Sequence, residues 1–166
     1  ICPLHGPIWR KDMQTFISKY DLWSSYKPEE KTVFIAYSSI YGDTANVCEI
    51  LANKLGEQGV KNITMYDLSS TDVSYAISQA FRCSHIVLAS PTHNMNIYPT
   101  MERFLTELIH HNMQSRYISI ISNGSWAPVA RELIKEKVDQ LENITYIDPV
   151  INILSAVKEE QIKDNL

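Results

Sequence analysis

The pattern of hydrophobic and polar positions predicts strands and helices that follow one another in turn along most of the chain. Strands are predicted at 33–37, 63–68, 85–89, 117–121 and 144–154, the last one around a proline. Helical spacing of apolar residues predicts helices at 43–55, 72–82, 99–111, 127–141 and 157–166. The runs 33–37 and 85–89 are apolar almost throughout, which is typical of strands buried on both faces. The pattern therefore predicts an α/β fold with one parallel sheet and helices on both sides.

The first thirty residues follow a different pattern. Residues 1–10 contain two prolines and a glycine and show no periodicity, as in a linker. Asp12 can cap a helix, and apolar residues then recur at helical spacing from Met13 to Trp23. Pro28 ends this pattern. We therefore divide the chain into a linker with one amphipathic helix, 1–30, and a body, 31–166.

Composition narrows the class of protein. With 166 residues, 45% of them hydrophobic, the chain has the size of one domain and is too apolar for disorder. No apolar run approaches the ~18 residues of a membrane span. Three scattered cysteines exclude a disulfide framework and a cysteine zinc site, and they favour a reducing cytoplasm. The net charge of -4 argues against nucleic acid as a partner.

Ligands bind such sheets beyond the carboxyl ends of the strands, where the strand order reverses. The loop 38–44 lies there and opens a helix, so its backbone N–H groups with Ser39 and Thr44 would form an anion site. It holds no Lys or Arg, and the P-loop and dinucleotide patterns are absent. This favours the phosphate monoester of a bound cofactor. The alternative is that Ser and Thr only cap the helix and that Gly42 makes the turn.

Two further loops, 90–99 and 122–128, reach the same edge of the sheet. Asn94 and Asn96 could hydrogen-bond the edge of a planar heterocycle, and Trp126 could stack on it. The alternatives are a core aromatic that caps the sheet at Trp126 and a solvated loop residue at His93. Together, the three loops suit a mononucleotide that carries a flat ring, such as FMN.

Several segments resemble a known family. Residues 39–44 resemble the flavodoxin phosphate loop, S/T-x-x-G-x-T. The segments CPLHGPIWR at 2–10, SPTHN at 90–94 and NGSWAP at 123–128 resemble the C-terminal half of flavodiiron proteins, the A-type flavoproteins. HGPIWR is the most specific of these, because free-standing flavodoxins lack it. The resemblance implies a flavodoxin-like three-layer sandwich with a five-stranded parallel sheet in the order 2-1-3-4-5.

The resemblance also implies a function and a site. In this family FMN passes electrons from a rubredoxin or a flavin reductase to a di-iron site in an N-terminal metallo-β-lactamase-like domain, which reduces O2 or NO. The family occurs as head-to-tail dimers, so we expect a homodimer in the cytoplasm, as in enzymes of anaerobes that detoxify oxygen or nitric oxide. The residues implied to bind FMN are Ser39, Ile40, Tyr41, Gly42, Asp43, Thr44, Pro91, Thr92, His93, Asn94, Asn123, Gly124, Ser125 and Trp126.

The metal site of the family is not expected in this chain. His5 matches the last iron-ligating histidine of the family, but the H-x-E-x-D-H motif that supplies other ligands is absent. One histidine cannot hold a di-iron site. We therefore predict no metal and no catalytic residue here, and we interpret 1–30 as the boundary of a missing domain. The start at Ile1 and the absence of a signal peptide fit that interpretation.

Three departures from the family pattern are found, of which Ile40 is the smallest, because that position would contribute mainly its backbone N–H. Asp43 stands where the family often has a neutral residue, and a carboxylate beside a phosphate is unfavourable, so we expect it to face solvent and stabilise the helix N-terminus. Asn94-Met95-Asn96 replaces Asn-Asn-Gly, and we expect Asn96 to take the positive φ of that glycine.

Three hypotheses follow. The first is an FMN-binding electron-transfer domain of a flavodiiron oxidoreductase. The second is a flavodoxin-like docking or dimerisation module without FMN, which Asp43 and Met95 favour. The third is an FMN-dependent quinone reductase, against which the HGPIWR segment argues. Uptake of FMN by the purified protein separates the first two.

Overall fold

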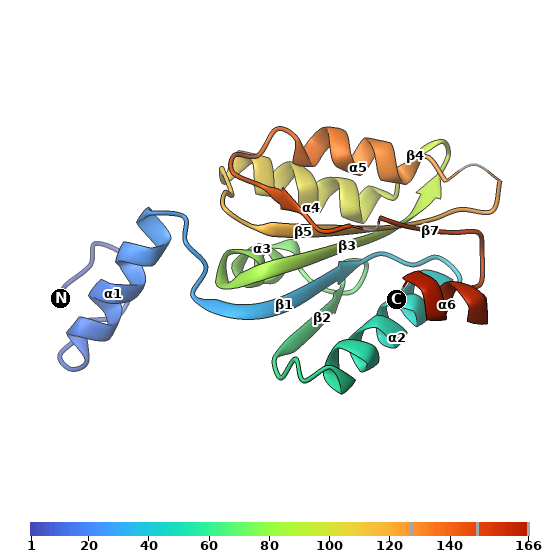
Figure 1. The fold of residues 1–166 in the computed structure, drawn as a ribbon. Coiled ribbons are helices and arrows are strands. Elements are labelled where there is room, and N and C mark those ends of the chain that lie inside the picture. The colour runs from blue at the N-terminus through green and yellow to red at the C-terminus, as the bar shows by residue number, and fades with distance from the viewer. Residues whose placement is uncertain (127, 149, 166) are drawn as a thin grey trace.

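The computed structural model describes residues 1–126, 128–148 and 150–165 (Figure 1). In this part of the chain the helices are α1 (Met13–Ser24), α2 (Asp43–Glu57), α3 (Val73–Arg82), α4 (Pro99–His110), α5 (Ala130–Val138) and α6 (Glu159–Asn165). The strands are β1 (Glu30–Tyr37), β2 (Ile63–Asp67), β3 (Cys83–His93), β4 (Asn96–Ile97), β5 (Tyr117–Asn123), β6 (Thr145–Tyr146) and β7 (Ile151–Ile153).

The sheet has the predicted parallel order. It runs β2-β1-β3-β5-β6, with β7 as a second parallel partner of β5. The prediction of order 2-1-3-4-5 is thus confirmed, because β5 takes the fourth place and β6 and β7 share the fifth. The short strand β4, which was not predicted, folds back antiparallel on β3.

The fifth predicted strand, 144–154, is interrupted. Ile118 pairs with Tyr146 and Ile121 pairs with Ile151, so two residues separate the paired positions along β5 and four separate them along the segment after α5. Such an excess of residues on one strand disrupts the ladder locally and divides this segment into β6 and β7. Pro149, which the prediction placed inside the strand, lies outside the described residues. The helix predicted at 127–141 is also shorter, and Ala127 likewise lies outside them.

Two hydrophobic cores lie on the two faces of the sheet. On one face α3, α4 and α5 pack on β1, β3 and β5, with Phe34 and Phe104 among the fully buried side chains. On the other face α2 contributes Val47 and Cys48 to a smaller core that includes Ile35 and Ile153. Figure 1 shows the resulting three layers. This confirms the flavodoxin-like three-layer sandwich expected from the sequence.

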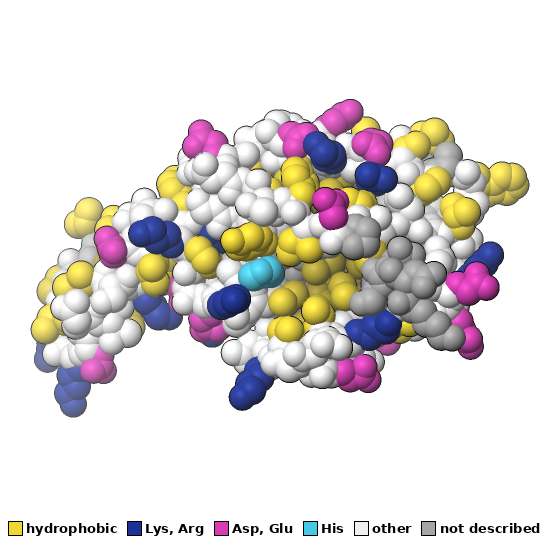
Figure 2. All heavy atoms as spheres, in the orientation of Figure 1, with side chains coloured by type: hydrophobic (Ala, Val, Ile, Leu, Met, Phe, Trp, Pro, Cys, Tyr) yellow, Lys and Arg dark blue, Asp and Glu magenta, His cyan; other side chains and the backbone are white. Residues whose placement is uncertain are grey.

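The helix α1 stands at one end of the molecule and contains no buried residue (Figure 1). Figure 2 shows hydrophobic side chains on its surface, at the left of the view, and the Ile17 and Tyr20 side chains are 53% and 62% exposed. The Asp12 side chain makes no capping hydrogen bond, contrary to the prediction. Asp12 adopts a left-handed conformation, and its backbone carbonyl accepts the N–H groups of Thr15 and Phe16, as the carbonyl of an N-cap residue normally does.

A buried arginine ties the segment before β1 to the body. Arg116 is only 2% exposed, and its guanidinium donates to the carbonyl oxygens of Tyr26 (2.7 Å), Phe81 (2.6 Å) and Gln114 (2.7 Å). Burial lowers the pKa of Arg116 to about 10. Because these carbonyls belong to three separate segments, Arg116 fixes where the chain enters the sheet.

Candidate functional site

The loop between β1 and α2 turns sharply at Gly42, whose φ of 97° is unfavourable for other residues. The Ser39 hydroxyl oxygen accepts the N–H groups of Gly42 (3.1 Å) and Ala45 (3.4 Å), so this side chain helps to cap the first turn of α2. Its binding of FMN stays a prediction. Among the described residues, the N–H groups of Asp43 and Thr44 in the first turn have no hydrogen-bond partner. They are free to bind an anion.

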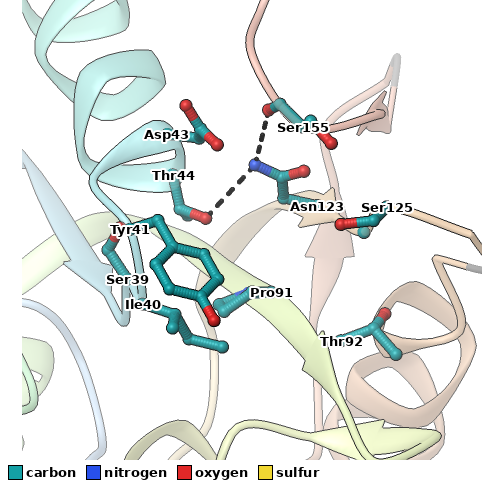
Figure 3. A pocket seen from close by; sticks show the side chains of 11 residues that line it. Ser39, Ile40, Tyr41, Asp43, Thr44, Pro91, Thr92, Asn123, Ser125 and Ser155 are labelled. Carbon is teal, nitrogen blue, oxygen red and sulfur yellow. Dashed lines mark hydrogen bonds between the residues drawn. The ribbon is translucent and has the colours of Figure 1, made fainter.

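A pocket of about 120 Å³ opens at the carboxyl ends of the central strands (Figure 3). This volume is below the ~300–1,000 Å³ of pockets that enclose a whole small molecule, and it suits a group the size of a phosphate. It lies between the phosphate loop, the end of β3, the end of β5 and the loop after β7. The residues that line it are Ser39, Ile40, Tyr41, Asp43, Thr44, Pro91, Thr92, Asn123, Gly124, Ser125 and Ser155.

Four of the predicted residues lie outside this lining. Gly42 shapes the phosphate loop without lining the pocket. His93 and Asn94 belong to the β3–β4 hairpin, where the His93 ring packs edge-on against Tyr98, with 5.5 Å between the ring centroids. Trp126 is 96% exposed, so it is not a core aromatic. A role of these four residues in binding FMN stays a prediction.

The β3–β4 hairpin corrects one expectation about the backbone. Thr92 pairs with Ile97 and His93 with Asn96, which leaves Asn94 and Met95 as the two turn residues. A two-residue turn of this kind requires positive φ at both positions, and the φ values are 49° at Asn94 and 59° at Met95. Asn96 was expected to take the positive φ, but it lies in β4.

Ser155 lines the pocket and was not predicted. Its N–H donates to the Gly124 carbonyl (3.3 Å), and the Gly124 N–H donates to the Ile153 carbonyl (3.1 Å). The loop after β7 is therefore joined to the loop after β5. Ser155 directly follows the predicted strand 144–154, so the same argument about strand ends that selected the other three loops could have found it.

Asn123 connects this added loop to the phosphate loop. Its side chain is almost fully buried, and Nδ2 donates to the Ser155 carbonyl (3.0 Å) and to the Thr44 hydroxyl (3.5 Å), as the dashed lines in Figure 3 show. Gly124 packs closely against the chain itself, since a Cβ there would lie 3.0 Å from the Cα of Pro128 and that backbone would have to shift.

The electrostatics of the pocket are unusual for a phosphate site. Among the described residues that line the pocket, Asp43 is the only charged one. It is half-buried and lies on the pocket wall, as Figure 3 shows, so the expectation that it faces solvent and stabilises the N-terminus of α2 stays a prediction. The remaining polar groups are hydroxyls, one amide and backbone N–H groups at the positive end of α2. This donor set fits the phosphate and hydroxyl groups of a mononucleotide such as FMN.

No metal centre or membrane segment is found in the described part of the chain. No three His, Cys, Asp or Glu side chains lie together there in a way that could hold a metal ion. His5 is exposed in the N-terminal segment. None of the described helices is both long enough and apolar enough to cross a bilayer.

Two curated proteins resemble this chain over most of its length. An uncharacterised protein of Methanocaldococcus jannaschii is 29% identical over 163 residues, which cover 98% of this chain and 41% of that protein. A nitric oxide reductase of Moorella thermoacetica is 26% identical over 138 residues, which cover 83% of this chain and 34% of the reductase. The chain thus spans less than half the length of either relative.

A solved structure shows the same fold. The flavodiiron protein of Giardia intestinalis superposes with a TM-score of 0.85 at 22% identity, over 95% of this chain and 39% of that one. The family profile described as "Flavodoxin domain" matches residues 34–145, which is more than half of the chain. The chain is therefore a flavodoxin-like domain related to flavodiiron proteins, and it belongs to the flavodoxin domain family.

Proposed function

We propose that this domain binds FMN in the pocket and transfers electrons within a flavodiiron oxidoreductase. The observation that carries the proposal is the pocket itself: uncharged donors converge on a space of phosphate size at the N-terminus of α2. When bound, FMN supplies one-electron and two-electron redox chemistry. The domain then needs no general base or nucleophile of its own.

The chain's own residues would hold the cofactor as follows. The N–H groups of Asp43 and Thr44 and the Thr44 hydroxyl would donate to the phosphate, assisted by the positive end of α2. The Thr92 hydroxyl oxygen accepts the N–H of Ala130 (3.1 Å), so its own hydrogen remains available to the pocket. The Ser125 and Ser155 hydroxyls offer further donors and acceptors for a polyol chain.

The proposal for the whole protein rests on the relatives and on the N-terminal segment. The matched relatives are more than twice as long as this chain, and one of them is a nitric oxide reductase. HGPIWR and α1, which has no buried residue, suit the boundary with a metallo-β-lactamase-like domain that carries the di-iron site. A rubredoxin or a flavin reductase would donate the electrons, and O2 or NO would accept them. A cytoplasmic homodimer belongs to the same proposal.

Titration of the purified protein with FMN tests the central claim. We expect quenching of flavin fluorescence with one FMN bound per chain, and weaker binding by Thr44→Val, which removes a donor. Thr71→Val, in the loop after β2, is the matched control and should bind as the wild type does. Mass spectrometry identifies any cofactor that copurifies. A colourless protein that takes up no added FMN would contradict the proposal.

The alternative of a docking module without FMN has one observation in its favour. The carboxylate of Asp43 lies on the wall of a pocket whose described lining includes no Lys or Arg, and it would repel a phosphate dianion. Absence of FMN uptake, together with self-association of the same sample in sedimentation experiments, would support that alternative.

A further inference from the structure

Asn123 occupies the junction of three loops of the pocket. It ends β5, where it pairs with Pro91 of β3 on one side and with Ile153 of β7 on the other. Its side chain is 4% exposed and reaches the phosphate loop through Thr44, which is 2% exposed. Water therefore has little access to the contact between these two side chains.

The partners of Asn123 determine where the Thr44 hydrogen can point. The Ser155 carbonyl can only accept, so the amide atom 3.0 Å away from it must be Nδ2. The second hydrogen of that same NH2 group is directed at the Thr44 hydroxyl oxygen, 3.5 Å away. The Thr44 oxygen is thus an acceptor towards Asn123. Its own hydrogen is left to donate elsewhere, and Thr44 lines the pocket.

We propose that Asn123 is a positioning residue for the phosphate end of the site, which orients the Thr44 hydroxyl as a donor to the phosphate and holds the Ser155 loop against it. This inference rests on the proposed binding of FMN. It differs from the role that the family resemblance implies, in which Asn123 lines the flavin ring. The two roles make different demands on the ligand, since only one of them requires a phosphate.

Riboflavin, which lacks the phosphate, distinguishes the two roles. For Asn123→Leu we expect FMN affinity to fall about threefold to tenfold, the size of effect of one ordinary hydrogen bond. Riboflavin affinity should change less than twofold. Asn46→Leu, an exposed position on α2, is the matched control and should leave both affinities unchanged. Equal losses for the two flavins, or no loss for either, would overturn the inference.

A double-mutant cycle tests whether Asn123 acts through Thr44. If it does, Asn123→Leu should weaken FMN binding no further when Thr44→Val is already present. Fully additive losses would show that the two side chains act independently and would overturn the inference. Asn123→Ser, which keeps a polar side chain of smaller volume, serves in the same assays if the leucine variant does not fold.

Flavin binding by the wild-type protein distinguishes failure of the proposed function from failure of the inference about Asn123. A wild-type protein that binds neither flavin contradicts the proposed function and removes the basis of the inference. A wild-type protein that binds FMN more tightly than riboflavin, combined with an Asn123→Leu variant that keeps this preference in full, contradicts the inference alone.

Discussion

The inner and outer parts of the site differ in how many contacts the chain makes to hold their side chains in place. The inner part, Thr44, Asn123 and Ser155, is joined by hydrogen bonds across three loops, and its two larger polar side chains are at most 4% exposed. We call Tyr41, which lines the pocket, and Trp126, which follows the lining residue Ser125, the outer rim; they are 91% and 96% exposed. The comparison indicates that contacts within the chain fix the inner part, whereas the outer rim has surface left for a ligand or a protein partner.

The strongest test of the inner part is to overfill it. In Gly124→Val the new Cβ would lie 3.0 Å from the Cα and 3.2 Å from the N of Pro128, and backbone atoms cannot move aside cheaply. We expect the free energy of unfolding to fall by about 1–3 kcal/mol, as for other overpacked sites. Urea denaturation measures this change, and FMN affinity should fall with it because the loop must shift.

Gly56→Ala provides the control for this experiment. A Cβ at Gly56 would meet no atom within 4 Å, and the residue lies within helix α2. Alanine there should raise the free energy of unfolding by about 0.5–1 kcal/mol, because glycine is the poorer helix former. A Gly124→Val variant that is as stable as the wild type would show that the inner part is less tightly fixed than the contacts indicate.

At the outer rim, a substitution should change the affinity for flavin but not the stability of the fold. Trp126 is almost fully exposed, so Trp126→Ala should leave the free energy of unfolding within about 0.5 kcal/mol of the wild type. If the indole stacks on the flavin, FMN affinity should fall by about 0.5–1.5 kcal/mol, roughly twofold to tenfold. Riboflavin should lose as much as FMN, because stacking does not involve the phosphate.

Tyr75→Ala is the matched control for the rim. Tyr75 is also exposed, at 68%, but it lies on α3 and outside the pocket lining. Its removal should change neither flavin affinity. A Trp126→Ala variant that binds both flavins like the wild type would assign Trp126 to another surface, such as that for the electron donor, and equilibrium binding to a rubredoxin would then test that role.

The parts of the structure that could be predicted from the sequence are those that depend on local features. Strand order and the phosphate loop follow from periodicity and from local chemistry, as at Gly42, where one residue sets the turn. Ser155 follows the predicted strand 144–154, so the argument from strand ends could have found it, but its hydrogen bond to Gly124, far away in sequence, does not follow from local chemistry. The position of Met95 in the turn depends on the register of the β3–β4 hairpin. A shift of one residue changes which side chains reach the site, and no composition argument fixes that register.

Charge offers a smaller test at the inner part. Asp43→Asn removes the one charged side chain among the described residues that line the pocket. We expect FMN affinity to rise about threefold to fivefold, since a carboxylate near a phosphate costs on the order of 1 kcal/mol in a solvated site. Riboflavin affinity should not change. The unfolding free energy should fall slightly, because Asp43 is the acidic residue in the first turn of α2.

Glu49→Gln is the control for charge alone. Glu49 is exposed on the same helix but does not line the pocket. The variant should leave the preference for FMN over riboflavin unchanged. If Asp43→Asn weakens FMN binding instead, the carboxylate makes a favourable contact with the ligand and does not repel it.

The smallest effect is expected at the turn beside the rim. Met95 has a φ of 59°, which costs a non-glycine residue about 1–2 kcal/mol, and its side chain is 66% exposed. Met95→Gly should therefore raise the free energy of unfolding by up to about 0.5 kcal/mol, because the greater freedom of glycine in the unfolded chain offsets part of the gain. Asn94→Gly should change it less, since asparagine tolerates this conformation. If Met95→Gly is destabilising, the methionine side chain stabilises the hairpin by contacts that outweigh the strain. The rim would then be more ordered than its exposure suggests, and the contrast with the inner part would narrow.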